Sequence, residues 1–518
     1  MTRTARATAV ASVVVVAAVL RVWAADYDLP YIYHPDEPVN VGITQRMFTS
    51  GDANPHFFGY PSLLYYLNTV VYALYYLMGH ADGTLRSMGD VAPLVELAMG
   101  VTKAPQPALI ALSRGLTIAF GAGTVLITFL AGLRLLGNDW TALFAATIVA
   151  VSPANVALSR LITPDTFVTF FAAATLLAAT YVMDRGTWRD YLLAGVLAGL
   201  TASAKYNGGL VILSVVAAHF LRVNRTPRND RMLLAAFFAC AAGFVAASPF
   251  AVLAPAEFLA GLALDAQVYT KGHAGMEGDT LRWYIAHMGA TAGVVYVFSG
   301  LEILRGLWAR SRPLLLLAAF PLVYFTFIAA FEVRNDRTFL PITPFLFLLA
   351  ASFLSFATGH ASRIASLTPK HVRAATLAAV LVALFQPAGK AVRDTLQLLH
   401  SDSRRAARLW IEENIPAGSR IAIEPYAPFL DPGRYAIQAF ERLTIHDPDW
   451  YASKGFQYVV ASEGLYGRFF REPDRYAVYM KEYERLFARL PLVREFPDHG
   501  YEIRVYAASA DGANVGLR

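Results

Sequence analysis

The chain has 518 residues, of which 56% are hydrophobic and only 16% are charged, and its mean hydropathy is +0.43. This balance excludes an ordinary soluble globular protein and is typical of a polytopic membrane protein. The pI near 9.2 does not require a nucleic-acid partner, because arginines in short loops between spans give the same positive surplus. The single cysteine, Cys240, excludes an intrachain disulfide.

Apolar runs that could cross a bilayer recur from the N-terminus to about residue 390. A crossing helix needs about 20 mostly apolar residues. The predicted spans are 8–25, 115–134, 140–158, 166–183, 191–204, 208–221, 232–253, 289–308, 313–331, 339–357 and 374–389. We interpret the first span as an uncleaved anchor, because no small-residue cleavage site precedes a soluble domain and further spans follow.

The run 60–79, YPSLLYYLNTVVYALYYLMG, is also long enough to cross, so charge must decide its topology. Lys and Arg concentrate in the short cytoplasmic loops of membrane proteins. A crossing here would send the segment 222–231, RVNRTPRNDR, to the outside, against this rule. We therefore predict that 60–79 forms juxtamembrane or re-entrant helices within a large first outer loop, 26–114. Its many tyrosines suit the headgroup region.

From about residue 395 the pattern becomes that of a small α/β domain. The segment SDSRRAARLWIEEN predicts a helix capped near Ser401 or Ser403, and a Pro-Ala-Gly turn then leads into a strand. FQYVVAS, LVREF and YEIRVYAAS are further candidate strands, interleaved with a helical pattern at 472–489. The predicted domains are thus 1–394 in the membrane and 395–518 on its outer side.

With this topology, ionisable residues from five segments gather on the outer side of the membrane. They are Asp36 and Glu37; Arg160 and Asp165; Lys205 beside Tyr206; Lys271, His273, Glu277 and Asp279; and Arg334, Asp336 and Arg337. Charges at span ends are costly when unpaired and mark either function or paired structure. One water-filled cavity facing the outer leaflet would accommodate them all.

Each of these groups also has a purely structural interpretation. Asp36 and Glu37 could form a solvated turn between two prolines. Arg160 and Asp165 could be an ion pair at a helix start, with Asp165 near the N-cap. Lys205 could extend its amine from a helix end towards water.

Two further groups leave the same choice open. Arg334 and Arg337 could bind lipid headgroups nonspecifically, and His273, in a Gly-rich loop, is more often a surface histidine. The functional interpretation depends on all five segments occurring on one face.

Several motifs together resemble the GT-C group of integral-membrane glycosyltransferases. HPDEP, after the first span, is similar to the acidic pair of that group, and YPSLLYYL to the juxtamembrane stretch that follows it. LSRGLTIAFGAGTVLITFLAGLRLLG, SRLITPDTFVTFF, AGLTASAKYNGGLV and RTFLPITPFLFLLAA resemble later signatures. The resemblance covers about 8–357 and is strongest to the branch of the protein O-mannosyltransferases and aminoarabinose transferases. It implies a GT-C fold of about 11 spans, with a large first outer loop and a small C-terminal α/β extracytoplasmic domain.

The resemblance also implies a reaction at the outer side of the cell membrane. A sugar leaves a polyprenyl-phosphate carrier and passes, with inversion, to an acceptor protein, lipid or glycan. The donor is lipid-linked because no nucleotide sugar is available outside, which agrees with the lack of a Rossmann fingerprint or phosphate loop. A non-enzymatic transporter or lipid-handling protein is the alternative, and it would predict inverted-repeat halves that the sequence does not show.

Roles for individual residues follow from this chemistry. Asp36 is the candidate base that takes the acceptor proton. Glu37 and Asp165 complete the candidate catalytic acids: Glu37 has a supporting role, in which it orients the acceptor or holds a juxtamembrane helix, and Asp165 binds acceptor or sugar hydroxyls. Cations should stabilise the departing phosphate. The candidate phosphate-binding residues are Arg334, Arg337, Lys205, Arg160 and Tyr206. The candidate substrate contacts are His34, Tyr60 and His273. His34 and His273 could bind a divalent ion with the acids, but no compact ligand motif is present. The resemblance to the mannosyltransferase branch implies a metal-independent design, so no metal is expected to be required.

Overall fold

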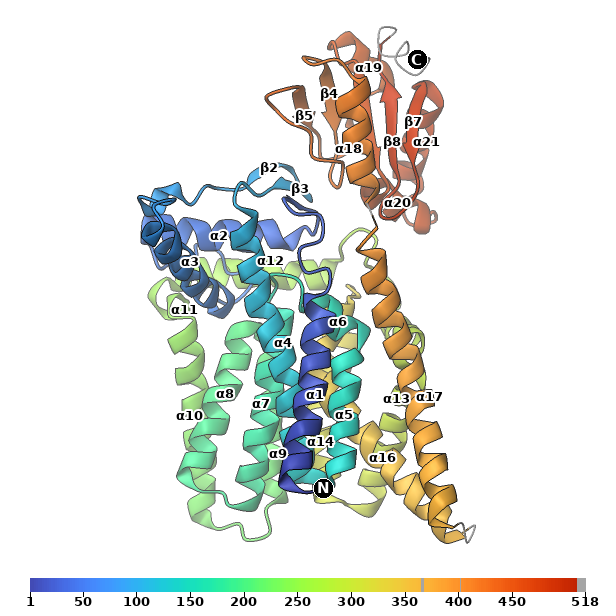
Figure 1. Cartoon of the computed structure of the whole chain (residues 1–518). Coiled ribbons are helices and arrows are strands. Elements are labelled where there is room, and N and C mark those ends of the chain that lie inside the picture. Colours follow the sequence, from blue (N-terminus) through green and yellow to red (C-terminus); the bar gives the residue numbers. More distant parts are fainter. Residues whose placement is uncertain (365–367, 401, 510–518) are drawn as a thin grey trace.

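The computed structural model of the chain describes residues 1–364, 368–400 and 402–509. A bundle of long helices carries a small sheet domain at one end and the N-terminus at the other (Figure 1). The end of the bundle nearest to the sheet domain is named the domain end here.

Eight helices in the described part of the chain are long and apolar enough to cross a membrane. They belong to α1 (Arg3–Val22), α4 (Pro107–Leu136), α7 (Asp165–Asp184), α10 (Pro227–Ala247), α13 (Thr280–Ala309), α14 (Arg312–Ala329), α16 (Thr343–Ile364) and α17 (Pro369–Gln397). The shorter α5 (Asp139–Val151), α8 (Trp188–Ala204) and α9 (Ile212–Leu221) pack among them. The protein is therefore a polytopic membrane protein, and the count of eleven crossings stays a prediction.

Prolines and glycines explain where helix bounds differ from the predicted spans. The predicted span 140–158 is two helices, because Pro153 cannot continue α5 and instead begins α6 (Pro153–Leu158). The predicted span 208–221 starts as a 3₁₀ turn, η2 (Tyr206–Val211), which contains two glycines. Only its second half is α-helical.

The predicted span 232–253 is likewise interrupted, at Pro249. Helix α10 ends before it, and the short α11 (Phe250–Leu253) follows. The next helix, α12 (Pro255–Lys271), has no counterpart among the predicted elements and lies across the bundle at the domain end (Figure 1). Leu253 and Leu259 are exposed on this α11–α12 segment, as expected for side chains that face lipid.

The segment between α1 and α4, still named the first outer loop after its predicted side, lies at the domain end, beyond the long helices (Figure 1). It contains α2 (Asp36–Ser50), α3 (Leu63–Ala81) and η1 (Met88–Asp90). A small antiparallel sheet follows the order β1 (Tyr31–Ile32), β3 (Val101–Lys103), β2 (Val95–Ala98). As predicted, the segment 60–79 does not join the bundle, and α3 is not among the helices able to cross.

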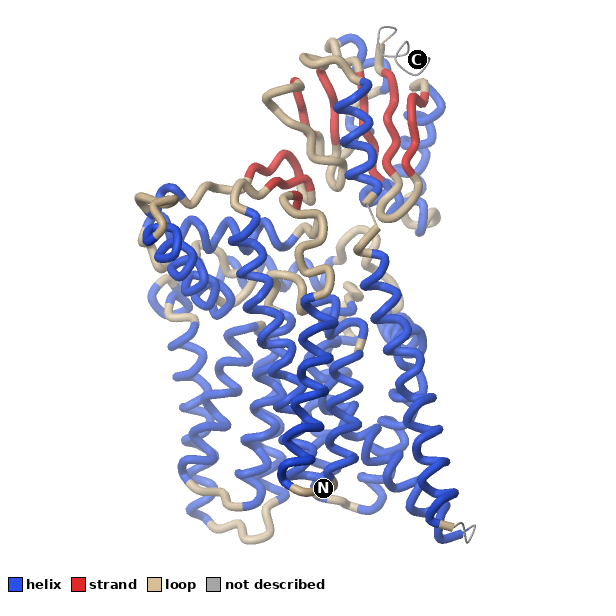
Figure 2. Tube along the Cα trace, viewed as in Figure 1, coloured by secondary structure: helices blue, strands red, loops and turns tan. Residues whose placement is uncertain are grey.

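The C-terminal domain is built on a five-stranded sheet, and Figure 2 shows its strands apart from the small sheet of the outer loop. Its elements are α18 (Ser403–Asn414), β4 (Arg420–Ile423), β5 (Ala436–Ala439), η4 (Leu443–Ile445), α19 (Pro448–Ser453), β6 (Tyr458–Ser462), α20 (Glu463–Arg471), α21 (Ala477–Arg489), β7 (Leu492–Phe496) and β8 (Ile503–Ala507). The strand order is β5-β4-β6-β8-β7, with β4 parallel to β5 and β6, and β8 antiparallel to β6 and β7. All predicted strands are present, and β5 is additional.

The predicted cap of the first helix in this domain is displaced by one residue. Asp402 is the N-cap of α18, and its side chain accepts a hydrogen bond from the Arg404 amide. Ser401 lies outside the described residues.

The C-terminal domain docks on the domain end through an apolar contact, in which Val101 joins its core, and through polar contacts. The Arg334 guanidinium forms an ion pair with Glu472 at 2.6 Å, and the Tyr476 hydroxyl donates to Glu277. The Tyr426 amide donates to the Met99 carbonyl of the first outer loop at 2.9 Å. The domain is thus held to the loop before α13, to the loop before α15 (Asp336–Phe339) and to the first outer loop.

Candidate active site

Asp36 is in the first turn of α2, where its negative charge complements the helix dipole. Its carboxylate forms an ion pair with Arg337, on α15. His34 lies beside them and accepts a hydrogen bond from the Asp36 amide through Nδ1 at 3.3 Å. Burial favours the neutral carboxyl, but the charge and hydrogen bond of Arg337, together with His34 and Lys205, outweigh it and lower the pKa of Asp36. Asp36 is therefore an ionised carboxylate at neutral pH.

Glu37, the next residue, points to a different environment. Its carboxylate receives two hydrogen bonds from Arg114 of α4, at 3.0 and 2.8 Å, and one from the Ile162 amide at 3.1 Å. Both charged side chains are fully buried. Arg114 also donates to the Ala25 carbonyl. Glu37 therefore ties the start of α2 to α4 and to the segment before α7, and it lines neither of the cavities described below.

Asp165 and Lys205 form a second buried ion pair. Asp165 is the first residue of α7, Lys205 follows the last residue of α8, and their charged atoms are 2.9 Å apart. The side chains are only 1% and 7% exposed, so Lys205 does not extend to bulk water. One oxygen of Asp165 has no hydrogen-bond partner among the described residues. The pairing of Asp165 with Arg160, one of the structural alternatives, is not what the structure shows.

Arg160 lies away from these pairs and forms hydrogen bonds with helices of the bundle. Its guanidinium donates to the carbonyls of Leu20 and Arg21 at the end of α1, and to the Thr395 hydroxyl of α17 at 2.7 Å. Because Arg160 lines neither cavity, its predicted role in phosphate binding gains no support from its position.

The remaining predicted residues divide between the site and the domain contact. Tyr60 and Tyr206 line cavities, and the Tyr206 hydroxyl donates to the Phe58 carbonyl at 3.0 Å. Arg334 forms an ion pair with Glu472 of the C-terminal domain. His273 is exposed in the loop between α12 and α13. The structure thus brings Tyr60 and Tyr206 to the cavities and places the other two outside them.

Two cavities meet beside these ion pairs. The larger, of about 660 Å³, includes Asp36, His56 and Glu257 in its lining. The smaller, of about 460 Å³, includes Lys205 and Tyr206 and is otherwise mainly apolar and aromatic. The two share Gly59, Tyr60 and Asp265 as lining residues. The candidate base therefore lies on one cavity and a candidate phosphate ligand on the other.

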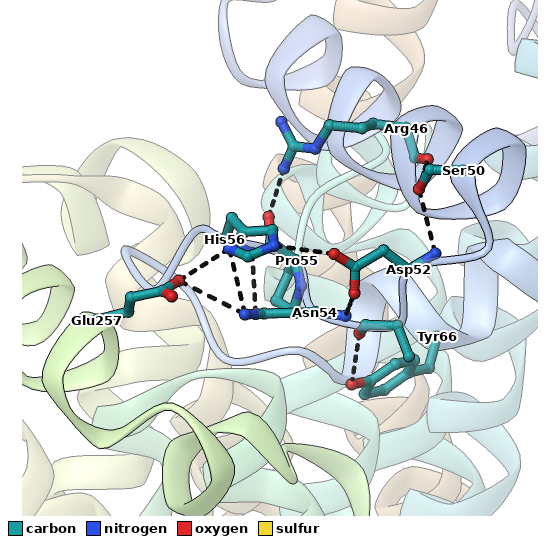
Figure 3. A network of polar contacts seen from close by, with 9 residues as sticks. Arg46, Ser50, Asp52, Asn54, Pro55, His56, Tyr66 and Glu257 are labelled. Carbon is teal, nitrogen blue, oxygen red and sulfur yellow. Dashed lines mark hydrogen bonds and ion pairs between the residues drawn. The ribbon is translucent and has the colours of Figure 1, made fainter.

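A polar network fixes the rim of the larger cavity (Figure 3). The His56 ring bridges two acids, with Nε2 2.9 Å from Asp52 and Nδ1 2.9 Å from Glu257 of α12. Asn54 and Arg46 also bind this loop, through the His56 amide and the Pro55 carbonyl. Hydrogen bonds to both acids raise the pKa of His56. The network joins the α2–α3 connection to α12.

A metal site is not formed by these groups. Among the described residues, no three His, Cys, Asp or Glu side chains are grouped so as to hold a metal ion. Independence from metal remains a prediction of the sequence.

The sequence did not reveal several residues of this site. Arg114 is the last residue of the predicted outer loop 26–114, directly before the predicted span 115–134, and it was given no role. His56, Glu257 and Asp265 depend on α12 crossing the domain end, which the sequence did not indicate. The one usable signal was the charge of Arg114 at the start of an apolar run.

Comparisons with known proteins agree with this architecture. Residues 97–261 match the family model described as dolichyl-phosphate-mannose-protein mannosyltransferase. The solved structure of ArnT from Cupriavidus metallidurans bound to undecaprenyl phosphate aligns with 97% of this chain and 98% of that chain, with a TM-score of 0.56 and 15% identity. This chain has the GT-C fold. The predicted resemblance to the GT-C group is thereby confirmed.

A second solved structure shows the same fold. The apo oligosaccharyltransferase of Archaeoglobus fulgidus aligns with 98% of this chain and 75% of that chain, with a TM-score of 0.56 and 13% identity. The archaeal oligosaccharyltransferase AglB from Archaeoglobus fulgidus, in complex with an inhibitory peptide and a dolichol-phosphate, aligns with 97% of this chain and 74% of that chain, with a TM-score of 0.53 and 14% identity. None of the curated protein sequences compared with the chain matches it significantly.

Proposed function

We propose that this GT-C protein transfers a sugar from a polyprenyl-phosphate carrier to an acceptor on the extracytoplasmic side of the membrane. The observation that supports this proposal most strongly is the pair of adjoining cavities, with the ionised Asp36 on one and Lys205 on the other. The structures of ArnT and AglB, which hold undecaprenyl phosphate and dolichol-phosphate, support a lipid-phosphate donor.

The smaller cavity suits the carrier. Its aromatic and aliphatic lining, which includes Leu262, Tyr269 and Phe331, can hold the start of a polyprenyl chain, and Lys205 can face the phosphate. The larger cavity offers room for the acceptor beside Asp36. The anomeric carbon would then lie where the cavities meet, at Tyr60.

The reaction is a displacement at that carbon. As the acceptor hydroxyl attacks, Asp36 takes its proton, a bond forms from the acceptor oxygen to the anomeric carbon, and the bond from that carbon to the phosphate oxygen breaks. The electron pair leaves with the polyprenyl phosphate, whose growing charge is stabilised by Lys205 and Arg337. The configuration at the anomeric carbon inverts.

Arg337 links the two halves of this mechanism. In the structure it pairs with Asp36, and a carboxylate held by a guanidinium is a poor base because its pKa is lowered. A donor phosphate gives Arg337 a second anion to bind, in the bidentate manner that guanidinium favours. Donor binding would therefore release Asp36 for the acceptor, so the donor would bind before the acceptor reacts.

The test uses the full chain in lipid nanodiscs with undecaprenyl phosphate and with undecaprenyl-phosphate sugars made with different hexoses and pentoses. We expect undecaprenyl phosphate to bind. The acceptor is identified separately, by mass spectrometry of envelope glycans, lipids and glycoproteins from cells lacking the protein. With that acceptor, Asp36→Asn should reduce the release of undecaprenyl phosphate by at least about 10³-fold, within the range for loss of a general base. Donor binding should stay intact.

The matched control is Asp474→Asn, the same chemical change at an exposed position of the C-terminal domain. Near-normal turnover by Asp36→Asn would exclude the base role. Binding of the donor lipid with no transfer by the unmodified protein, to any acceptor identified, would instead favour a lipid-handling protein.

A further inference from the structure

Asp265 occupies the junction of the two cavities. It lies on α12, the helix that crosses the domain end, and it lines both the larger and the smaller cavity. Only Gly59 and Tyr60 share this double position in the described lining. Of these three residues, Asp265 alone carries a charge.

Asp265 differs from the other acids around the cavities because it has no partner. Asp36 pairs with Arg337, Asp165 with Lys205 and Glu257 with His56. The Asp265 side chain makes no hydrogen bond or ion pair with any residue that the structure describes. A partly buried carboxylate without a partner is costly, so its position calls for a ligand that supplies hydrogen-bond donors.

The electrostatics of the junction are consistent with such a role. Burial raises the pKa of Asp265 to about 6, and the nearby charge of Lys205 opposes this shift only in part. At neutral pH the group is therefore mainly ionised. A carboxylate with a perturbed pKa in a cleft is a frequent mark of a functional site.

We propose that Asp265 binds hydroxyl or ammonium groups of the transferred sugar and thereby selects neutral or cationic sugars over acidic ones. This inference rests on the proposed function, because the sugar is placed where the cavities meet. An ionised carboxylate only accepts hydrogen bonds, which suits hydroxyl and ammonium groups. Asp265 and Asp36 would together repel a carboxylate carried by the sugar, so selection includes an unfavourable contact with the wrong substrate.

Three lipids serve as probes for the full chain in nanodiscs: undecaprenyl phosphate, mannosyl-phosphoundecaprenol and glucuronosyl-phosphoundecaprenol. We expect the unmodified protein to bind the mannosyl lipid at least about tenfold more tightly than the glucuronosyl lipid, the size of one hydrogen bond to a charged group. Asp265→Asn should lower this ratio towards one, because it removes one of the two repelling charges. Asp265→Ala should do the same and also weaken mannosyl-lipid binding, since it removes the acceptor.

Bare undecaprenyl phosphate is the internal control, because it lacks the sugar. Both variants should bind it as the unmodified protein does, which also shows that they are folded, and Asp474→Asn should leave the mannosyl-to-glucuronosyl ratio unchanged. An unaltered ratio in both Asp265 variants, with bare-lipid binding retained, overturns the role of Asp265 and leaves the proposed function standing. Failure of the unmodified protein to bind any of the three lipids overturns both.

Discussion

At the scale of single residues, two adjacent acids have unlike environments because a helix turns about 100° per residue. Asp36 pairs with Arg337 at the edge of a cavity, whereas Glu37 is fully buried against Arg114. The sequence predicted both as candidate catalytic acids and gave Glu37 only a supporting role. The structure places Glu37 as a tie between α2 and α4, and only Asp36 faces space in which a substrate could bind.

Glu37→Gln should therefore impair stability more than chemistry. The change leaves the fully buried Arg114 without its carboxylate, and removing one partner of a buried ion pair costs about 3–5 kcal/mol. We expect a lower midpoint in thermal unfolding of the detergent-purified protein, together with loss of transfer at higher temperatures.

The matched control for this prediction is Asp36→Asn, whose pair is partly exposed. Its unfolding midpoint should change less than that of Glu37→Gln. Equal midpoints for the unmodified protein and Glu37→Gln would contradict the structural role of the Glu37–Arg114 pair.

Sequence reasoning identified charges well at this scale but not their partners. Asp36, Asp165, Lys205 and Arg337 all lie at the candidate site, because a charge at the end of an apolar span is conspicuous. The pairings join residues far apart in the chain, and no local pattern encodes them. Asp265 remained hidden because its helix was not predicted.

At the scale of elements, prolines and glycines shape the site more than the apolar pattern indicates. Hydropathy predicted the long helices, but it continued through Pro249 and so missed the break from which α11 and α12 emerge. The position of α12 then brings Glu257 to His56 and Asp265 to both cavities. Composition alone does not say whether a segment such as 255–271 lies across a bundle or crosses the membrane.

Because His56 bridges Asp52 and Glu257, the stability of the contact between the α2–α3 connection and α12 should depend on pH. The pKa of His56 is raised above its usual 6.5 by hydrogen bonds to Asp52 and Glu257. Its stabilising contribution is thus full below pH 6.5 and is lost as pH rises through the raised value. Hydrogen exchange of backbone amides in 255–271 should accelerate between pH 6 and pH 9 beyond the intrinsic chemical increase.

His56→Gln provides the comparison, since it keeps a hydrogen-bonding side chain but has no charge to lose. After correction for intrinsic exchange rates, α12 in this variant should be equally protected at both pH values. A pH-dependent loss of protection in His56→Gln as large as in the unmodified protein would show that another group is responsible.

At the scale of the whole molecule, the C-terminal domain is docked by an apolar contact as well as by polar ones. Val101 of β3 is part of the apolar core of the domain, and the Tyr31 ring lies 5.7 Å from the Phe429 ring. Arg334 with Glu472, Tyr476 with Glu277, and the Tyr426 amide with Met99 add polar contacts to three different segments. The sequence predicted this domain and most of its strands from period-two patterns. It could not predict the docking, because contacts between residues far apart in the chain leave no periodic trace.

Reversing one charge should loosen this docking. In Glu472→Lys the partner of Arg334 becomes a like charge, so the domain should sample a wider range of positions. With Cys240 replaced by Ser, spin labels at exposed Val478 of α21 and Leu77 of α3 should give a broader distance distribution.

The double variant Arg334→Glu with Glu472→Lys restores opposite charges and should narrow the distribution again. A distribution that is unchanged in Glu472→Lys would mean that the other contacts hold the domain without this pair.

Helix α12 also makes the site a neighbour of the bilayer. Leu253 and Leu259 are exposed on the α11–α12 segment that also carries Asp265 to the cavities, so one wall of the proposed reaction site would also be part of the membrane surface. Acyl-chain length and lateral pressure would then act directly on the spacing of the groups proposed to react. Turnover in the proposed reaction should consequently differ between thin and thick bilayers of the same headgroup.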